Sequence, residues 1–198
     1  GAKSFATYLV DCKKVGVKSD FPIRGPLPKG LVMADKGPVG MAISLRKSVQ
    51  PFVETVVLLP RILHLGIGCR RGTPMNQIEE LALQELTKLK MTMTVVKRIA
   101  SIDVKKDEAG LLSFAEEYAL PIRFYTAEEL NAVEGDFTPS SFVAKTVGVD
   151  NVCERAAVLD SKNGKLLLRK TSKNGVTLAV TAEDFVVDFN LQPEYKVK

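Results

Sequence analysis

Segment 62–72 combines side chains that could bind a negatively charged ligand. An apolar run ends there in three glycines, a thiol and two adjacent arginines, which are Gly66, Gly68, Cys69, Arg70, Arg71 and Gly72. Thr73 and Pro74 then give a helix-start pattern, with Thr73 as the expected cap, so we predict a buried strand, a tight turn and a helix N-terminus. Helix N-terminal N–H groups and guanidinium groups both favour anions. The segment therefore predicts an anion-binding site.

The standard nucleotide motifs do not fit this turn. The glycine spacing misses the dinucleotide fingerprint by one residue, and no Gly-Lys-Ser/Thr closes a phosphate loop. A dinucleotide site would also need an acidic ribose contact about 20 residues further on. Glu85 is the only acid in 82–90, and it falls within a predicted helix. We therefore expect an anion that is not a standard nucleotide.

Two further polar clusters follow later predicted strands. The first is 101–108, which includes Ser101, Asp103, Lys105 and Glu108, and the second joins Glu154 and Arg155 to Arg169 and Lys170. Ligands of α/β sheets bind beyond the carboxyl ends of the strands. We therefore expect all three clusters to converge on one rim of the sheet.

Each candidate also has a purely structural interpretation. The paired arginines could be solvated turn residues, and Asp107, Glu108 and Glu154 could be acids that complement a helix dipole. His64 lies inside an apolar strand pattern, so a hydrogen-bonded core histidine is expected there, not a catalyst. Cys69 could have a lowered pKa beside a helix N-terminus, but no histidine nearby supports a nucleophilic role.

Composition limits the classes of partner. The chain has 198 residues and a formal net charge of +5, which favours acidic partners. Trp is absent and the basic residues are scattered, so a small polyanion in a cleft is favoured over nucleic acid. No apolar run approaches the ~20 residues of a membrane span, and three widely spaced cysteines indicate reduced thiols in a cytosol.

Residues 1–60 predict a small strand-rich α/β region. Strands are expected at 14–18, 31–34, 39–45 and 56–59, and a short helix at 4–11. This region is too small for a comfortable core of its own, so it should pack on other parts of the protein.

Residues 61–198 alternate strand and helix patterns. Strands are expected at 62–67, 95–102, 122–125, 166–169 and 176–181, and helices at 78–89, 107–115, 126–129, from 140 to before 148, and 151–159. The connection 172–175 has hairpin chemistry. This order predicts an α/β fold, a three-layer αβα domain with a mostly parallel sheet.

Several of these stretches, in this order, strongly resemble one known family. They are 66–72, 100–111, 148–157 and the paired 166–170 and 176–180. They resemble the C-terminal domain of the CbiG cobalamin-biosynthesis family, which standalone CobE proteins share. Segment 14–60, including 35–38 and 59–61, resembles the central region of longer CbiG proteins.

The resemblance implies a reaction and a substrate. Full-length CbiG is cobalt-precorrin-5A hydrolase of the anaerobic cobalamin pathway, which opens a lactone, releases acetaldehyde and gives cobalt-precorrin-5B. It also carries an N-terminal domain, so we expect this chain to be a fragment whose partners are that domain and other pathway enzymes. The implied protein is cytoplasmic and holds no cofactor or metal of its own, because cobalt arrives in the tetrapyrrole ring.

That chemistry suggests roles for the candidates. Lactone opening needs a base for water and donors for the developing oxyanion. Glu108 or Glu154 would be the base, and Lys105, Arg70 or the Gly68–Cys69 backbone would stabilise the oxyanion. The substrate-binding set is Gly66, Gly68, Cys69, Arg70, Arg71, Ser101, Asp103 and Lys170. The alternative function is a non-catalytic module that binds the tetrapyrrole or hands it over.

Overall fold

The computed structural model describes residues 3, 6–7, 11, 14–139 and 148–191. The chain divides into two compact units, and the second comprises Arg61–Asp184. The first unit is assembled from both ends of the chain, because residues from Phe185 onward group with those up to Pro60. The expected helices at 4–11 and from 140 fall largely or wholly outside the described residues.

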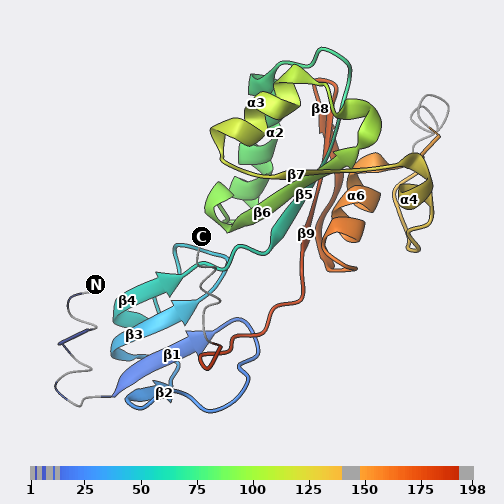
Figure 1. The fold of residues 1–198 in the computed structure, drawn as a ribbon. Helices are drawn as coiled ribbons and strands as arrows, with labels where there is room; N and C mark the ends of the chain where they lie inside the picture. Colours follow the sequence, from blue (N-terminus) through green and yellow to red (C-terminus); the bar gives the residue numbers. More distant parts are fainter. Residues whose placement is uncertain (1–2, 4–5, 8–10, 12–13, 140–147, 192–198) are drawn as a thin grey trace, which may run out of the picture. The chain divides into compact units, whose positions relative to one another are not determined.

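The first unit contains a four-stranded parallel sheet (Figure 1). Its strands are β1 (Val15–Ser19), β2 (Leu31–Met33), β3 (Gly37–Ile43) and β4 (Phe52–Leu58), in the spatial order β2-β1-β3-β4. All four lie close to the ranges that the sequence predicts. The strands have three to seven residues, and Gly and Pro are frequent in the turns between them.

A small core covers one face of this sheet. Val17, Met41 and Ile43 pack with Val187, which comes from the far end of the chain. Val187 forms an isolated parallel bridge with Ile23. Residues that are 164 positions apart therefore share one core, which explains why 185 onward belongs with the first unit.

The second unit contains a five-stranded mixed sheet. Its strands are β5 (Leu63–Cys69), β6 (Val96–Ile102), β7 (Ile122–Tyr125), β8 (Lys165–Lys173) and β9 (Val176–Ala182), in the order β7-β6-β5-β9-β8. β5, β6 and β7 are parallel, whereas β9 runs antiparallel to both β5 and β8. The predicted hairpin at 172–175 is the β8–β9 turn.

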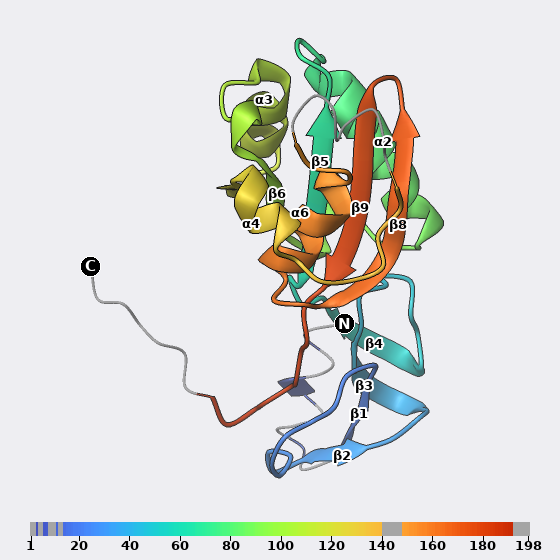
Figure 2. The ribbon, with the colours of Figure 1, turned by 90° about the vertical axis from the view of Figure 1, so that its right-hand side faces the viewer.

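Helices cover both faces of this sheet, which confirms the predicted α/β class (Figure 2). They are α2 (Met75–Lys88), α3 (Ala109–Glu117), α4 (Ala127–Asn131) and α6 (Val152–Asp160), with 3₁₀ turns η1 (Met93–Val95) and η2 (Asp103–Lys105). α2 and α3 lie on one face and α6 on the other. Among the described residues, no helix is long and apolar enough to cross a membrane.

The close packing of α6 against β5 depends on Gly66. A Cβ at this position would lie 1.8 Å from the Cys153 carbonyl oxygen and 2.9 Å from the Ala157 Cβ. The absence of a side chain at Gly66 therefore lets the backbone of α6 pack closely on the backbone of β5, at the centre of the sheet.

One of the two predicted helix caps is present in the structure. Thr126 forms the predicted capping box with Glu129, in which each side chain accepts the other's backbone N–H. The predicted Thr73 cap is wrong, because α2 begins after Pro74 and the Thr73 hydroxyl instead donates to the Arg70 carbonyl at 2.7 Å.

Candidate functional site

The β5–α2 turn is held in place by the β8–β9 turn. The Arg70 N–H donates to the Gly175 carbonyl at 2.9 Å, and the Arg70 side chain lies over Gly175. Gly68 lies beside Thr177, whose Oγ1 would be 2.6 Å from a Cβ there. Gly72 has φ +75°, which favours glycine and turns the chain into the helix. The predicted strand–turn–helix is confirmed.

Arg71 joins this turn to the loop after β6. Its Nη1 lies 3.1 Å from Asp107 Oδ1, and its Nη2 donates to the Val104 carbonyl at 3.2 Å. The side chains of Arg71 and Asp107 are 64% and 67% exposed, so this ion pair adds little stability. An anionic ligand could replace Asp107 at the guanidinium at little cost.

Glu108 is the buried acid of this rim. Its Oε2 accepts the Gly72 N–H at 3.0 Å, whereas Oε1 is buried and has no hydrogen-bond donor among the described residues. Oε1 does face two cations, Arg71 Nη1 at 3.2 Å and Lys105 Nζ at 3.9 Å. We call Cys69, Arg71, Lys105 and Glu108 the Glu108 cluster. It brings the first two predicted clusters together.

The thiol of Cys69 lies within the field of these charges. Burial raises the pKa of Cys69, and the Glu108 carboxylate adds to this effect. Lys105 and Arg71 oppose the rise but do not cancel it. The lowered pKa expected from the helix entry is therefore wrong, because desolvation outweighs the two cations. The raised pKa argues against Cys69 as an activated nucleophile.

Glu154 is held in a different way. The side chain is fully buried, and it accepts the Thr138 N–H at 2.9 Å, the Thr138 hydroxyl at 2.7 Å and the Lys170 N–H at 2.6 Å. Burial alone would raise the pKa of Glu154, but these hydrogen bonds and the Arg169 charge outweigh it and lower the pKa. Both oxygens are occupied by internal donors, so this geometry favours a structural role over the proposed base.

The predicted convergence of the third cluster with the other two on one rim stays a prediction, because no direct polar contact joins them among the described residues. Within the part of the chain that the structure describes, no hydrogen bond or ion pair links Glu154 to 66–72 or 101–108. Arg155 pairs with Asp150 at 2.8 Å, and Arg169 pairs with Asp136 at 3.4 Å. These contacts secure the segments that flank α6.

Ser101 and Asp103 occupy the end of β6. The Ser101 hydroxyl is buried and donates to the Ile67 carbonyl at 2.6 Å, so it ties β6 to β5. Asp103 opens the η2 turn that carries Lys105. Their expected place in the substrate-binding set stays a prediction, and the Ser101 hydroxyl is observed to join β6 to β5.

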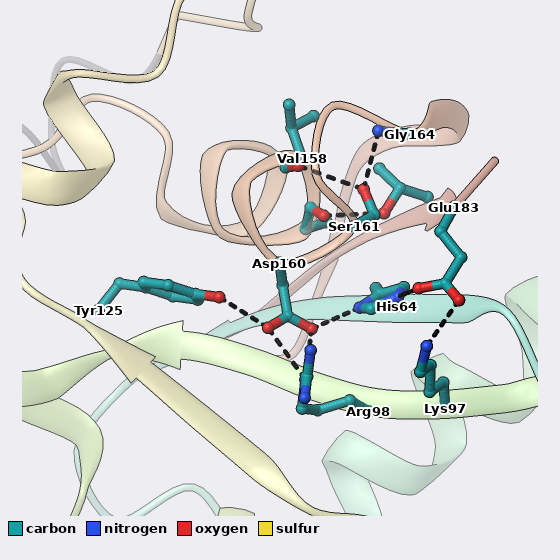
Figure 3. A network of polar contacts seen from close by, with 11 residues as sticks. His64, Lys97, Arg98, Tyr125, Val158, Asp160, Ser161, Gly164 and Glu183 are labelled. Atoms are coloured by element: carbon teal, nitrogen blue, oxygen red, sulfur yellow. Dashed lines mark hydrogen bonds and ion pairs between the residues drawn. The ribbon is translucent and has the colours of Figure 1, made fainter. Parts of the chain in front are cut away.

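His64 is a core histidine, as the sequence predicts. Both ring nitrogens face carboxylates, Nδ1 that of Asp160 and Nε2 that of Glu183 at 2.9 Å (Figure 3). Arg98 and Tyr125 also contact Asp160, at 2.8 and 2.7 Å for the closest atoms. No local sequence pattern indicates this network, because the hydrogen-bonded pairs are separated by 35 to 119 positions.

Comparison with known proteins supplies the family. The profile described as "Cobalamin synthesis G C-terminus" matches residues 63–181. The chain is 37% identical over 137 residues to a protein of Priestia megaterium named cobalt-precorrin-5A hydrolase, covering 69% of this chain and 36% of that protein. It is 29% identical over 188 residues to the probable cobalt-precorrin-5A hydrolase of Methanocaldococcus jannaschii, covering 89% of this chain and 57% of the relative.

One solved structure is similar to the second unit's fold. The crystal structure of CobE, a protein from the cobalamin biosynthetic pathway, superposes with a TM-score of 0.58 at 29% identity. The match covers 63% of this chain and 92% of CobE. The chain spans between about a third and three fifths of the length of the curated hydrolase relatives above. With the profile covering more than half of its residues, this chain belongs to the CbiG C-terminal family of cobalamin biosynthesis.

Proposed function

We propose that this chain carries a catalytic site of cobalt-precorrin-5A hydrolase, which opens the substrate's lactone and releases acetaldehyde to give cobalt-precorrin-5B. Family membership and the names of two relatives support the reaction. The Glu108 cluster supports the location. In this proposal, Glu108 is the base and Lys105 is the principal cation.

One observation carries the assignment of Glu108. Its Oε1 is buried without a hydrogen-bond donor among the described residues, although two cations lie within 4 Å of it. An unsatisfied buried acceptor costs about 1–3 kcal/mol, and more when it is charged. A water molecule, or a hydroxyl group of the substrate, would supply the donor. A water bound to a carboxylate at the edge of an anion site is positioned for general-base attack.

The reaction then uses groups already on this rim. Glu108 takes a proton as the water oxygen attacks the lactone carbonyl, and the carbonyl oxygen becomes an oxyanion. Lys105 and the Gly68–Cys69 backbone would stabilise that charge. The ring C–O bond breaks and the freed alkoxide forms acetaldehyde, while the C–C electron pair passes to the macrocycle. Protonated Glu108 can return its proton to that carbon.

The cations of the turn suit the rest of the substrate. Corrin precursors carry acetate and propionate groups around a flat ring, and guanidinium groups bind carboxylates bidentately. Arg71 is exposed, and so is its partner Asp107, so a substrate carboxylate can take the place of Asp107 at the guanidinium. Arg70, on the adjacent turn, would bind a second carboxylate.

A binding or hand-over module is the second candidate. One observation favours it, since the match to CobE covers 92% of that protein, so a domain of this kind also exists as a separate chain. The module would bind the tetrapyrrole through the same cations without using Glu108 as a base.

Acetaldehyde release by the purified chain, with tetrapyrrole binding measured in parallel, tests both candidates. Replacing Glu108 by Gln should lower turnover by about 10²–10⁴-fold, the usual contribution of a general base. The matched control is Asp107→Asn, which removes one carboxylate charge from the adjacent exposed residue and should leave turnover nearly unchanged. Equal activity of the two variants would reject Glu108 as the base. Tight binding without turnover in the unmodified chain would favour the module.

A further inference from the structure

A cavity in the first unit lies where the topology of its sheet predicts a ligand site. The spatial order β2-β1-β3-β4 places β2 and β3 on opposite sides of β1, and all four strands are parallel. The connections that leave β1 and its neighbour therefore diverge, and open α/β sheets bind ligands beyond the carboxyl ends at such a point. The cavity has a volume of about 300 Å³ and is lined by Lys18, Asp20, Ala42, Ile43, Ser44, Val49, Gln50 and Pro51.

Its lining separates an apolar floor from a polar rim. Lys18 and Ala42 are directly paired across β1 and β3, so the small methyl group of Ala42 leaves space beside the lysine stem. Val49 and Pro51 add apolar wall from the loop before β4. The volume lies at the lower limit of small-molecule pockets, which suits a short aliphatic group.

The polar wall opposite Lys18 is already satisfied. The Ser44 hydroxyl donates to Asp20 Oδ2 at 2.6 Å and accepts the Arg46 N–H at 3.1 Å. This arrangement fixes the start of the loop that closes the cavity. Asp20 therefore directs one oxygen toward the wall, where it anchors Ser44.

Lys18 is the cation of the lining, and it remains available for a ligand. Its only ion pair among the described residues is with Asp35, at 3.4 Å, and that carboxylate is 93% exposed. Such exposed pairs contribute roughly 0–1 kcal/mol, so a ligand carboxylate can displace Asp35. The closing loop also carries Arg46 and Lys47, which add positive charge on this side of the sheet.

We propose that this cavity binds a carboxylate on a short aliphatic arm, with Lys18 as its counter-charge. The apolar floor takes the methylene groups and the ammonium takes the carboxylate. The arm could belong to a free small acid or to a ring that bears several such arms. The proposal does not depend on Glu108 or on hydrolysis.

Titration of the ¹⁵N-labelled chain with sodium propionate, followed by amide chemical shifts, tests the site. Saturable shifts are expected for 18–20, 42–44 and Gln50. Lys18→Ala should weaken binding by about ten-fold or more, as the loss of one charge-assisted contact implies. Lys29→Ala removes the same charge from an exposed turn outside the lining and should bind propionate as the unmodified chain does.

Either of two kinds of result would overturn the proposal, one from the propionate titrations and one from a comparison with ethylammonium. One is equal propionate binding by the two lysine variants, or no saturable shifts at these amides. The other is stronger binding of ethylammonium than of propionate, which would make Asp20 the recognising group. A parallel titration with uroporphyrin III identifies the source of the arm. Tighter binding at the same amides indicates a polycarboxylated ring, and propionate binding alone indicates a free acid.

Discussion

His64, in β5, is hydrogen-bonded to Asp160, the last residue of α6, and both side chains are fully buried. A carboxylate at a helix C-terminus meets the unfavourable end of the helix dipole. Arg98 compensates with two contacts, at 2.8 and 3.0 Å, and the Tyr125 hydroxyl donates at 2.7 Å. The pair therefore fixes the end of α6 on three strands of the sheet.

Replacing Asp160 by Asn should strongly destabilise the second unit. The change removes the buried carboxylate that contacts Arg98 and His64, and breaking a buried pair in this way costs about 3–5 kcal/mol. Urea unfolding gives the free energy of unfolding directly. Asp136→Asn is the control, because its side chain is 95% exposed and should change that free energy little. Similar losses in the two variants would contradict the prediction.

The same network predicts how stability depends on pH. Burial would raise the pKa of Asp160 and of Glu183, but hydrogen bonds from His64, Arg98 and Tyr125, and for Glu183 from Lys97 and His64, lower both pKa values. A lowered folded-state pKa gives stability that is present above the unfolded value, about 4, and lost as pH falls through the folded value. Unfolding free energies measured from pH 7 to pH 3 should fall more steeply in the unmodified chain than in Asp160→Asn. Parallel curves would exclude this contribution.

Glu154→Gln tests whether the third cluster is structural. In Gln, an amide NH₂ group would replace one carboxylate oxygen and would face N–H or O–H groups that now donate hydrogen bonds to it. We therefore expect a loss of about 2–3 kcal/mol in the free energy of unfolding. Turnover per folded molecule should stay unchanged. Glu134→Gln, at an exposed position nearby in sequence, is the control for the loss of a charge. Abolished acetaldehyde release in a fully folded Glu154→Gln protein would return Glu154 to the catalytic residues.

The sequence was most informative where local patterns decide structure. The alternation of strands and helices from 61 onward, the Thr126 capping box and the turn at 66–72 were all readable, because periodicity and capping act over a few residues. Local sequence patterns do not reveal whether Glu154 lies close to the first two clusters in space. Helices lie on both faces of the sheet, with α2 and α3 on one and α6 on the other. Glu154 accepts hydrogen bonds from Thr138 and Lys170 because of how α6 packs, and that packing cannot be read from local sequence patterns. Burial of Cys69 was equally invisible, so its pKa was expected to shift in the wrong direction.

Gly66→Ala should prevent α6 from packing closely on β5. The new Cβ would lie 1.8 Å from the Cys153 carbonyl oxygen, so backbone must move, at a cost of about 3 kcal/mol or more. Gly72→Ala is the comparison, since nothing lies within 4 Å and only its φ of +75° opposes a side chain. That strain costs about 1–2 kcal/mol. The two melting temperatures should rank accordingly, and the reverse order would disprove the steric explanation.

The thiols should report on the Glu108 cluster without any substrate. Cys153 is buried with a pKa raised to about 12, so iodoacetamide should modify it only after unfolding. Cys69 should react slowly, because burial and Glu108 raise its pKa. Glu108→Gln should speed Cys69 alkylation and Lys105→Gln should slow it, as peptide mass spectrometry can measure for each cysteine. Identical rates of Cys69 alkylation in the two variants would show that Glu108 and Lys105 do not affect the pKa of Cys69.

The bridge between Ile23 and Val187 has a consequence for biosynthesis. Phe21 and Ile23 leave the ribosome long before Phe185 and Val187 are translated, a delay of roughly 8–30 s at about 5–20 residues per second. During that interval the earlier unit exposes an apolar surface that the nascent chain cannot yet cover, whereas the later unit is encoded without interruption. The residues from Phe185 onward thus complete the unit that is synthesised first, and chaperones have a defined window in which to act.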